Sequence, residues 1–390
     1  MNKYFYPLLI AQFLSAFADN AILFAVIAMV MQTAEPPSWY VPALQSVFLL
    51  GFVLLAPWVG KIADQFPKSR VLITANLIKA CGAGLLLFKL EPLIAYSLVG
   101  VGAALYSPAK YGILPELAEH NQLVKANSWI EASTIFAILT GMLVGAQLAD
   151  YSIDMALTGT IILFIGSAAT SLVLPVSSTH SPQQGAKIAW FFRDIRQFLQ
   201  RKRARFGILG ASLFWGAAAC VRVIIVAWAP LVLLSHNATD IANLTLFLAL
   251  GIITGSAIVP RLIPLEQIAR ARFPAYLMGL LIIALGFCSN VPLAKTILFL
   301  MGTAGGMFIV PINATLQAIG QQSVGSGGAV AMQNFFQNSA MLIAVGGYTL
   351  AASLQINPVL ALIGLGVLLL IGVIIAAWRM PKHSMPASLE

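Results

Sequence analysis

The chain has 390 residues, of which 59% are hydrophobic and only 9% carry a charged side chain. A soluble domain has roughly 25% charged residues because water must wet its surface, so this composition excludes an ordinary soluble protein. The net charge of +9 could suggest a nucleic-acid-binding protein. The positions of the charges argue against that class, and we expect no nucleic-acid partner.

Long apolar segments follow one another along the chain. A transmembrane helix needs about 20 apolar residues to cross a hydrocarbon core about 30 Å thick. The pattern predicts twelve such helices and therefore an all-α membrane protein. The predicted helices cover 7–32, 42–63, 70–89, 93–114, 123–149, 155–174, 206–235, 240–262, 273–290, 295–318, 327–352 and 357–379.

The first segment contains a carboxylate, Asp19, followed by Asn20, in the middle of an otherwise apolar helix. A charge at this depth costs at least ~2.5 kcal/mol, and it is usually tolerated by facing protein or a wet cavity and finding a partner. Asp19 therefore indicates a polar pathway inside a membrane protein.

The basic residues lie mostly on one side of the predicted helices. Most of the 22 Lys and Arg fall on the side of both termini, including the segment 187–205, whereas the opposite side holds only Lys89 and Lys295. That opposite side also carries acidic residues, namely Glu35, Glu91, Asp150, Asp154 and Asp240. The positive-inside rule places both termini in the cytoplasm. The N-terminal segment is too long for a cleaved signal peptide, and the expected location is a bacterial inner membrane.

The chain divides into two similar halves. We predict an N-terminal six-helix bundle at 1–174, a cytoplasmic linker at 175–205, a C-terminal six-helix bundle at 206–380 and a cytoplasmic tail at 381–390. The linker contains a basic amphipathic run from Trp190 to Leu199, which we expect to lie on the inner leaflet. Docking of a cytoplasmic partner is the alternative for this run.

Repeated residue spacings in the two halves support a duplication. A glycine precedes a proline by six residues in the fourth and tenth segments, at Gly102 and Pro108 and at Gly305 and Pro311. The first helix of each half carries one charge, and the two charges have opposite signs. Such internal repeats are typical of transporters.

The loop between the second and third segments carries a glycine, an aspartate four residues later and a basic cluster: Gly60, Asp64, Lys68 and Arg70. It resembles the loop of the major facilitator superfamily, except at Gln65 and Pro67. Glycine allows close approach of helices, and a carboxylate can cap a helix N-terminus or pair with a basic side chain. We expect these four residues to gate the two bundles of a major facilitator fold.

Other polar residues lie within the predicted helices. They are the candidates for substrate binding around a central polar cavity: Asp19, Asn20, Lys79, Lys110, Glu131, Arg222, Asn334 and Asn338. The guanidinium of Arg222 suits phosphate or carboxylate, whereas amides in membranes most often link helices. Structural ion pairs, or a salt bridge between the bundles that breaks during gating, remain alternatives to ligand contact.

Several longer strings resemble the bacterial lysophospholipid transporter family. They are 11–20 (AQFLSAFADN), 107–114 (SPAKYGIL), 123–127 (LVKAN), 212–217 (SLFWGA), 310–314 (VPINA) and Gln333-Asn334. The resemblance implies alternating-access transport of lysophosphatidylethanolamine and lysophosphatidylglycerol to the cytoplasmic leaflet. A separate acyltransferase–acyl-carrier-protein synthetase would reacylate them there. Asp19, Lys110 and Arg222 match the charges of the family.

Two other functions remain open at this stage. One is a proton-coupled exporter of amphipathic drugs on the same fold, and the other is a non-transporting platform that recruits the acyltransferase through 187–205. An enzyme is not expected, because neither a Ser/His/Asp arrangement nor a metal-ligand cluster is visible. We expect no cofactor and no metal. By analogy with the superfamily, we expect a monomer.

Overall fold

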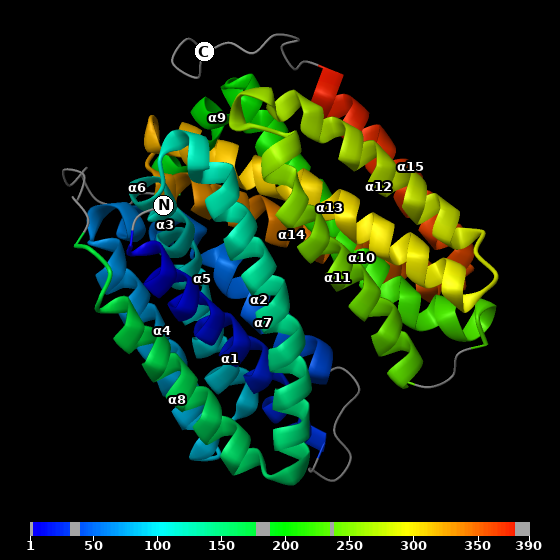
Figure 1. Ribbon diagram of the computed structural model, residues 1–390. Coiled ribbons are helices and arrows are strands. Elements are labelled where there is room, and N and C mark those ends of the chain that lie inside the picture. The colour runs from blue at the N-terminus through cyan, green and yellow to red at the C-terminus, as the bar shows by residue number, and fades with distance from the viewer. Residues whose placement is uncertain (1–2, 32–39, 177–187, 235–237, 379–390) are drawn as a thin grey trace. The chain divides into compact units, whose positions relative to one another are not determined.

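The computed structural model describes residues 3–31, 40–176, 188–234 and 238–378, and within these ranges the structure is helical without strands (Figure 1). The helices are α1 (Phe5–Met31), α2 (Tyr40–Leu54), α3 (Ala56–Gln65), α4 (Lys68–Leu87), α5 (Pro92–Gly112), α6 (Leu114–Leu117), η1 (His120–Gln122), α7 (Leu123–Tyr151), α8 (Ile153–Ser171), α9 (Ile188–Gln200), α10 (Lys202–Val232), α11 (Ala238–Leu262), η2 (Leu265–Ala271), α12 (Arg272–Gly286), α13 (Val291–Gln321), α14 (Ser326–Ser353) and α15 (Pro358–Trp378).

The lengths and apolar composition of these helices agree with a membrane protein. Ten spans within the described residues are long and apolar enough to cross a bilayer, and α2 with α3 forms an eleventh candidate. These two helices bend by 63° across a break at Leu55, so the predicted segment 42–63 corresponds to two helices and not to one continuous helix. The remaining predicted segment is α14, whose 28 residues include Gln333, Asn334 and Asn338.

The chain forms two compact units. Unit 1 contains residues 1–122, 133–195 and 317–335, and unit 2 contains 123–132, 196–316 and 336–390. Four helices, α7, α9, α13 and α14, therefore contribute residues to both units. The predicted bundles at 1–174 and 206–380, with the linker and tail, stay a prediction.

In unit 1 the helices pack as closely spaced pairs. α8 packs against both α1 and α4, and α5 packs against both α2 and α4. Glycines permit the tightest approaches: a Cβ added to Gly100 would lie 2.9 Å from the backbone of Phe48, and one added to Gly141 would press on the backbone of Phe17. Small residues bring helix backbones together in membranes, where dispersion and interhelical hydrogen bonds drive association.

Unit 2 repeats these pairings with the second set of helices. α15 packs against α10 and α12, as α8 packs against α1 and α4. Gly251 and Gly302 bring α11 and α13 together, as Gly100 does for α2 and α5. Equivalent helices of the two halves thus make equivalent contacts, in agreement with the duplication that the sequence suggested.

The amphipathic run forms helix α9. Phe191 is buried, and its ring meets that of Phe335 on α14 edge to face with centroids 5.8 Å apart. Phe192 is 52% exposed. The apolar face of α9 therefore contacts protein at Phe191, and the expected position of this run on the inner leaflet stays a prediction. The side chain of Trp190 lies outside the described residues.

Candidate functional site

A buried ion pair joins α1 and α4 in unit 1. The Lys79 ammonium lies 2.7 Å from Oδ2 of Asp19, and Lys79 is 0% exposed while the Asp19 side chain is 20% exposed. Both residues lie on helices that are apolar enough to span a membrane. Pairing reduces the cost of burying each charge, because an uncompensated charge in a low-dielectric interior is far more costly.

A chain of hydrogen bonds continues from the same ammonium. Lys79 also donates to the Ser15 hydroxyl at 2.8 Å, and Ser15 donates to Oδ1 of Asn76 at 2.8 Å. Asn76 then donates to the hydroxyl of Ser167 at 2.9 Å, and Ser167 donates to the Ala11 carbonyl at 2.6 Å. The network fixes α1, α4 and α8 together around the ion pair.

Aromatic rings complete the surroundings of Lys79. Its ammonium lies 4.6 Å from the ring centre of Tyr106 and 5.4 Å from that of Phe164, within the range of cation–π attraction. The second carboxylate oxygen of Asp19, Oδ1, is buried and has no hydrogen-bond partner among the described residues. Such an oxygen keeps lone pairs available for a further donor.

Two other candidates extend the polar surface of unit 1. Lys110 is buried near the end of α5, with its ammonium 4.2 Å from the ring centre of Tyr111. Asn334 on α14 donates to the Ser107 hydroxyl on α5 at 2.8 Å. Asn20 instead donates to the Ala16 carbonyl of its own helix at 2.8 Å, which is a local contact.

The remaining substrate candidates belong to unit 2. Glu131 on α7 and Asn338 on α14 are both buried. Arg222 is exposed on α10, and within the described residues its guanidinium makes neither a hydrogen bond nor an ion pair. An unpaired arginine so far along a membrane helix is costly unless it faces water or an anionic ligand.

The loop that carries the superfamily resemblance makes a defined contact. The Asp64 carboxylate accepts hydrogen bonds from the backbone N–H groups of Gly327 at 2.9 Å and Gly328 at 2.8 Å. These groups lie in the first turn of α14, where N–H groups have no partner within the helix. The negative charge also favours the positive end of the helix dipole. Asp64 thus makes the helix-capping contact that the sequence analysis allowed.

The other gating candidates surround this contact. A Cβ added to Gly60 would lie 2.8 Å from the Cβ of Ala331 on α14, so only glycine allows this approach. Lys68 is buried and pairs with Glu116 at 2.7 Å. Arg70 is exposed on α4. The gating role of these residues stays a prediction.

Sequence reasoning missed several residues of the networks. Ser15, Asn76 and Ser167 are small polar residues within apolar helices, and Glu116 pairs with the basic loop. A helical spacing could have identified two of them, since Ser15 lies four residues before Asp19 and Asn76 three residues before Lys79. No comparable local signal connects Asp64 with Gly327.

Comparison with known proteins places this arrangement in a family. The Major Facilitator Superfamily model matches residues 8–345. Lysophospholipid transporter LplT of Klebsiella pneumoniae subsp. pneumoniae is 42% identical over 373 residues, which cover 94% of this chain and 93% of the relative. The chain belongs to the LplT family of the major facilitator superfamily. The LplT of Cronobacter sakazakii is similar to it as well, at 41% identity over 90% of this chain and 89% of the relative.

Solved structures agree with the fold. The Escherichia coli fucose:proton symporter FucP matches 97% of this chain and 98% of its own length with a TM-score of 0.76 at 14% identity. A bacterial homologue of the iron transporter ferroportin, in an outward-facing state, matches 97% of this chain and all of its own length with a TM-score of 0.74 at 16% identity. The LplT-family chain therefore has the major facilitator fold and is a multi-pass membrane transporter, not an enzyme.

Proposed function

We propose that this protein transports lysophospholipids across a membrane by alternating access. The observation that carries the proposal is the identity of about 41% to proteins named lysophospholipid transporters, over nearly the whole chain. Fold alone does not define a substrate, so the residues of the membrane helices must account for the chemistry.

Arg222 is the proposed phosphate ligand. A lysophospholipid headgroup carries a phosphate that cannot enter hydrocarbon cheaply, and a guanidinium binds phosphate through two parallel hydrogen bonds. Arg222 is exposed on α10 without a partner among the described side chains, so its donors are available to a ligand. Lys110 would add a second positive charge. The acyl chain would stay against apolar helix surfaces or in the lipid.

Asp19 is the proposed partner of positively charged groups during the transport cycle. Its Oδ2 binds Lys79, while Oδ1 has no hydrogen-bond partner within the part of the chain that the structure describes. The free oxygen can accept a hydrogen bond from an ethanolamine ammonium without breaking the ion pair. Glu131, Asn334 and Asn338 would complete the polar surface that the headgroup follows.

Gating would depend on the capped helix. When the Asp64 carboxylate separates from Gly327 and Gly328, two backbone donors of α14 lose their acceptor, so the contact favours the conformation in which it is made. Gly60, Lys68 and Arg70 would support this conformation. Transport would then require repeated release and formation of the cap.

We place the protein in a bacterial inner membrane with both termini in the cytoplasm, on the distribution of Lys and Arg. The proposed direction is toward the cytoplasmic leaflet, where a separate acyltransferase–acyl-carrier-protein synthetase would restore the acyl chain. The proposed functional unit is a monomer. Membrane lipids surround it.

The test is uptake of labelled lysophosphatidylethanolamine into proteoliposomes, with and without an imposed proton gradient. We expect uptake by the wild type, loss of uptake in Arg222→Ala and Asp19→Ala, and partial retention in Arg222→Lys, which keeps the charge but not the planar fork. Equal amounts of folded protein must be present in each sample. Absence of uptake by the wild type in both conditions would overturn the proposal, and proton-dependent efflux of amphipathic cations would point to a drug exporter.

A further inference from the structure

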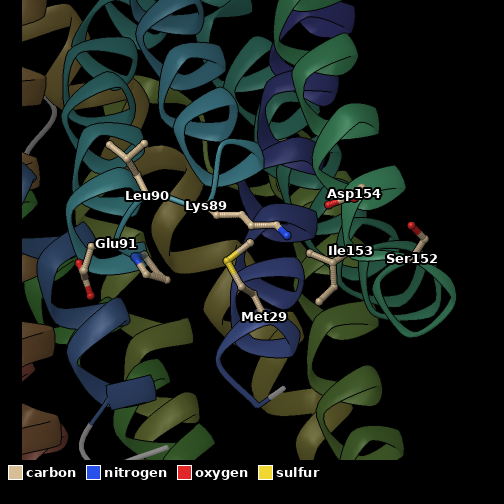
Figure 2. Close-up of a pocket in the computed structure, with 8 residues that line it drawn as sticks. Met29, Lys89, Leu90, Glu91, Ser152, Ile153 and Asp154 are labelled. Carbon is tan, nitrogen blue, oxygen red and sulfur yellow. The ribbon is translucent and has the colours of Figure 1, made fainter. Parts of the chain in front are cut away.

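A cavity lined by both charged and apolar side chains lies in unit 1, at the end opposite the Gly60–Arg70 loop. It has a volume of about 460 Å³ and is lined by Met29, Lys89, Leu90, Glu91, Pro92, Ser152, Ile153 and Asp154. These residues come from the end of α1, the α4–α5 turn and the start of α8. Figure 2 shows the Lys89 side chain extending across the cavity toward Ile153 and Asp154, with Glu91 on the other side.

Opposite charges line this cavity without neutralising each other. Lys89 and Asp154 make no ion pair with each other or with any described residue, although both border the same space. Glu91 is already engaged, because its carboxylate accepts a hydrogen bond from the Ile94 N–H at the start of α5. The cavity therefore offers one available ammonium and one available carboxylate.

The backbone holds Lys89 in an unusual conformation. The Leu90 N–H bonds to the Leu85 carbonyl at 3.0 Å and the Lys89 N–H to that of Leu86 at 2.9 Å, which is the Schellman end of a helix. The residue in this position adopts a left-handed conformation, and Lys89 has φ +58°. Glycine adopts it at no steric cost, whereas a lysine adopts it only with local strain.

The surroundings indicate the class of ligand. The residues that line the cavity have large apolar neighbours in the sequence, and the side chains of these neighbours are exposed: Phe88 (79%), Ile94 (64%), Tyr151 (80%) and Met155 (51%). In a membrane protein such residues face lipid, and the charged residues between them lie at the boundary with water. A lipid headgroup reaches this boundary while its acyl chain stays in the hydrocarbon.

We propose that this cavity binds the zwitterionic headgroup of a lysophospholipid, with its phosphate on Lys89 and its ammonium on Asp154. The ligand class rests on the proposed transport function. The cavity would hold substrate at the outer surface of the membrane before it reaches Arg222. An anionic lysophosphatidylglycerol shares the phosphate but has no ammonium, so Asp154 would favour lysophosphatidylethanolamine over it.

Two substitutions with one matched control test the cavity. Asp154→Asn removes the carboxylate, and Asp150→Asn makes the same change at an exposed residue of α7 that does not line the cavity. Lys89→Gly removes the ammonium while it relieves the left-handed strain, so weaker binding could not be attributed to a destabilised turn. Each change is made in the wild type and in Arg222→Ala, which removes the proposed phosphate ligand of the transport site.

Binding of both lysolipids to the purified protein is measured by native mass spectrometry, and uptake is measured in proteoliposomes. We expect Asp154→Asn to weaken binding of lysophosphatidylethanolamine about fivefold, to raise its KM for uptake by a similar factor, and to leave lysophosphatidylglycerol unchanged. Lys89→Gly should weaken binding of both lipids, and Asp150→Asn of neither.

The results separate this proposal from the proposed function. Wild-type affinities for both lipids in Asp154→Asn and Lys89→Gly would overturn the cavity proposal, whatever the uptake. A selective loss of lysophosphatidylethanolamine binding in Asp154→Asn, with no uptake by the wild type, would support the cavity and overturn transport. Equal weakening by Asp150→Asn and Asp154→Asn would overturn the cavity as well, because it would indicate a general surface-charge effect.

Discussion

The ammonium of Lys79 lies 2.7 Å from Oδ2 of Asp19, and the two residues are 60 positions apart in the sequence. Lys79 is fully buried and donates to Ser15 as well. The pair therefore connects α1 with α4 through two charged groups that the membrane would otherwise exclude. Each charge depends on the other, and the consequences of removing one differ from those of removing both.

Replacing Lys79 with Met leaves the Asp19 carboxylate buried without its counter-charge. Breaking a buried pair in this way typically costs about 3 kcal/mol, so we expect a clearly lower midpoint of thermal unfolding in detergent. The double variant Asp19→Asn, Lys79→Met removes both charges, and we expect most of the stability to return. Lys295→Met is the matched control, because Lys295 is half-buried and its ammonium makes no ion pair with a described residue, lying 5.3 Å from the ring centre of Phe247.

Uptake distinguishes a structural from a functional role for this pair. If Asp19 also takes part in transport, the double variant will be stable and inactive. A double variant with wild-type uptake would show that the pair serves stability alone. A Lys79→Met protein with wild-type stability would contradict the coupling between the two charges.

The cap on α14 leads to a second prediction. Asp64→Ala removes both acceptors of the Gly327 and Gly328 N–H groups, and loss of such a cap typically costs about 1 kcal/mol. Asp64→Asn keeps one oxygen acceptor and should have a smaller effect. We expect uptake to fall in the order wild type, Asp64→Asn, Asp64→Ala, measured at equal protein content. Equal uptake in all three proteins would show that the cap does not contribute to the transport cycle.

The two glycines that donate to Asp64, Gly327 and Gly328, provide a matched pair of substitutions. A Cβ added to Gly327 would lie 2.8 Å from the Cβ of Ala63 and 3.0 Å from Oδ1 of Asp64, whereas the nearest atom to one added to Gly328 is Oδ2 of Asp64 at 3.5 Å. Gly327→Ala should therefore reduce stability and uptake, while Gly328→Ala should resemble the wild type. Similar behaviour of the two variants in thermal unfolding would contradict this packing.

The sequence predicted the architecture well because the bilayer constrains it. Apolar length identified the membrane helices, and the lone charge at Asp19 identified a polar site within them. The bend at Leu55 was not predicted. Pro57 in the first turn of α3 is compatible with that bend, but proline at a helix start also occurs without one.

The partners of the candidate residues were harder to predict. The sequence identified Lys79 as a charged residue far along a membrane helix. Its pairing with Asp19 depends on the orientation of α1 and α4 about their axes, which the sequence does not give. The sequence allowed Asp64 to cap a helix, yet the capped helix begins at Ser326, more than 260 positions later. Contacts of this kind follow from tertiary packing, which local patterns do not encode. The prediction of the substrate came from the resemblance to a family and not from any single residue.

Close helix packing in unit 2 leads to a final prediction. A Cβ added to Gly302 would press on the Leu248 carbonyl and lie 2.9 Å from the Ile252 nitrogen, both on α11, and backbone atoms cannot move aside as a side chain can. Gly302→Ala should separate α11 from α13 and cost about 1–3 kcal/mol. Gly346→Ala is the control on α14, since no atom lies within 4 Å of its added Cβ. Alanine favours a helix over glycine by up to about 1 kcal/mol, so Gly346→Ala should be neutral or stabilising. Thermal unfolding of the purified proteins measures both, and a Gly302→Ala midpoint at or above that of Gly346→Ala would contradict the backbone contact between α11 and α13.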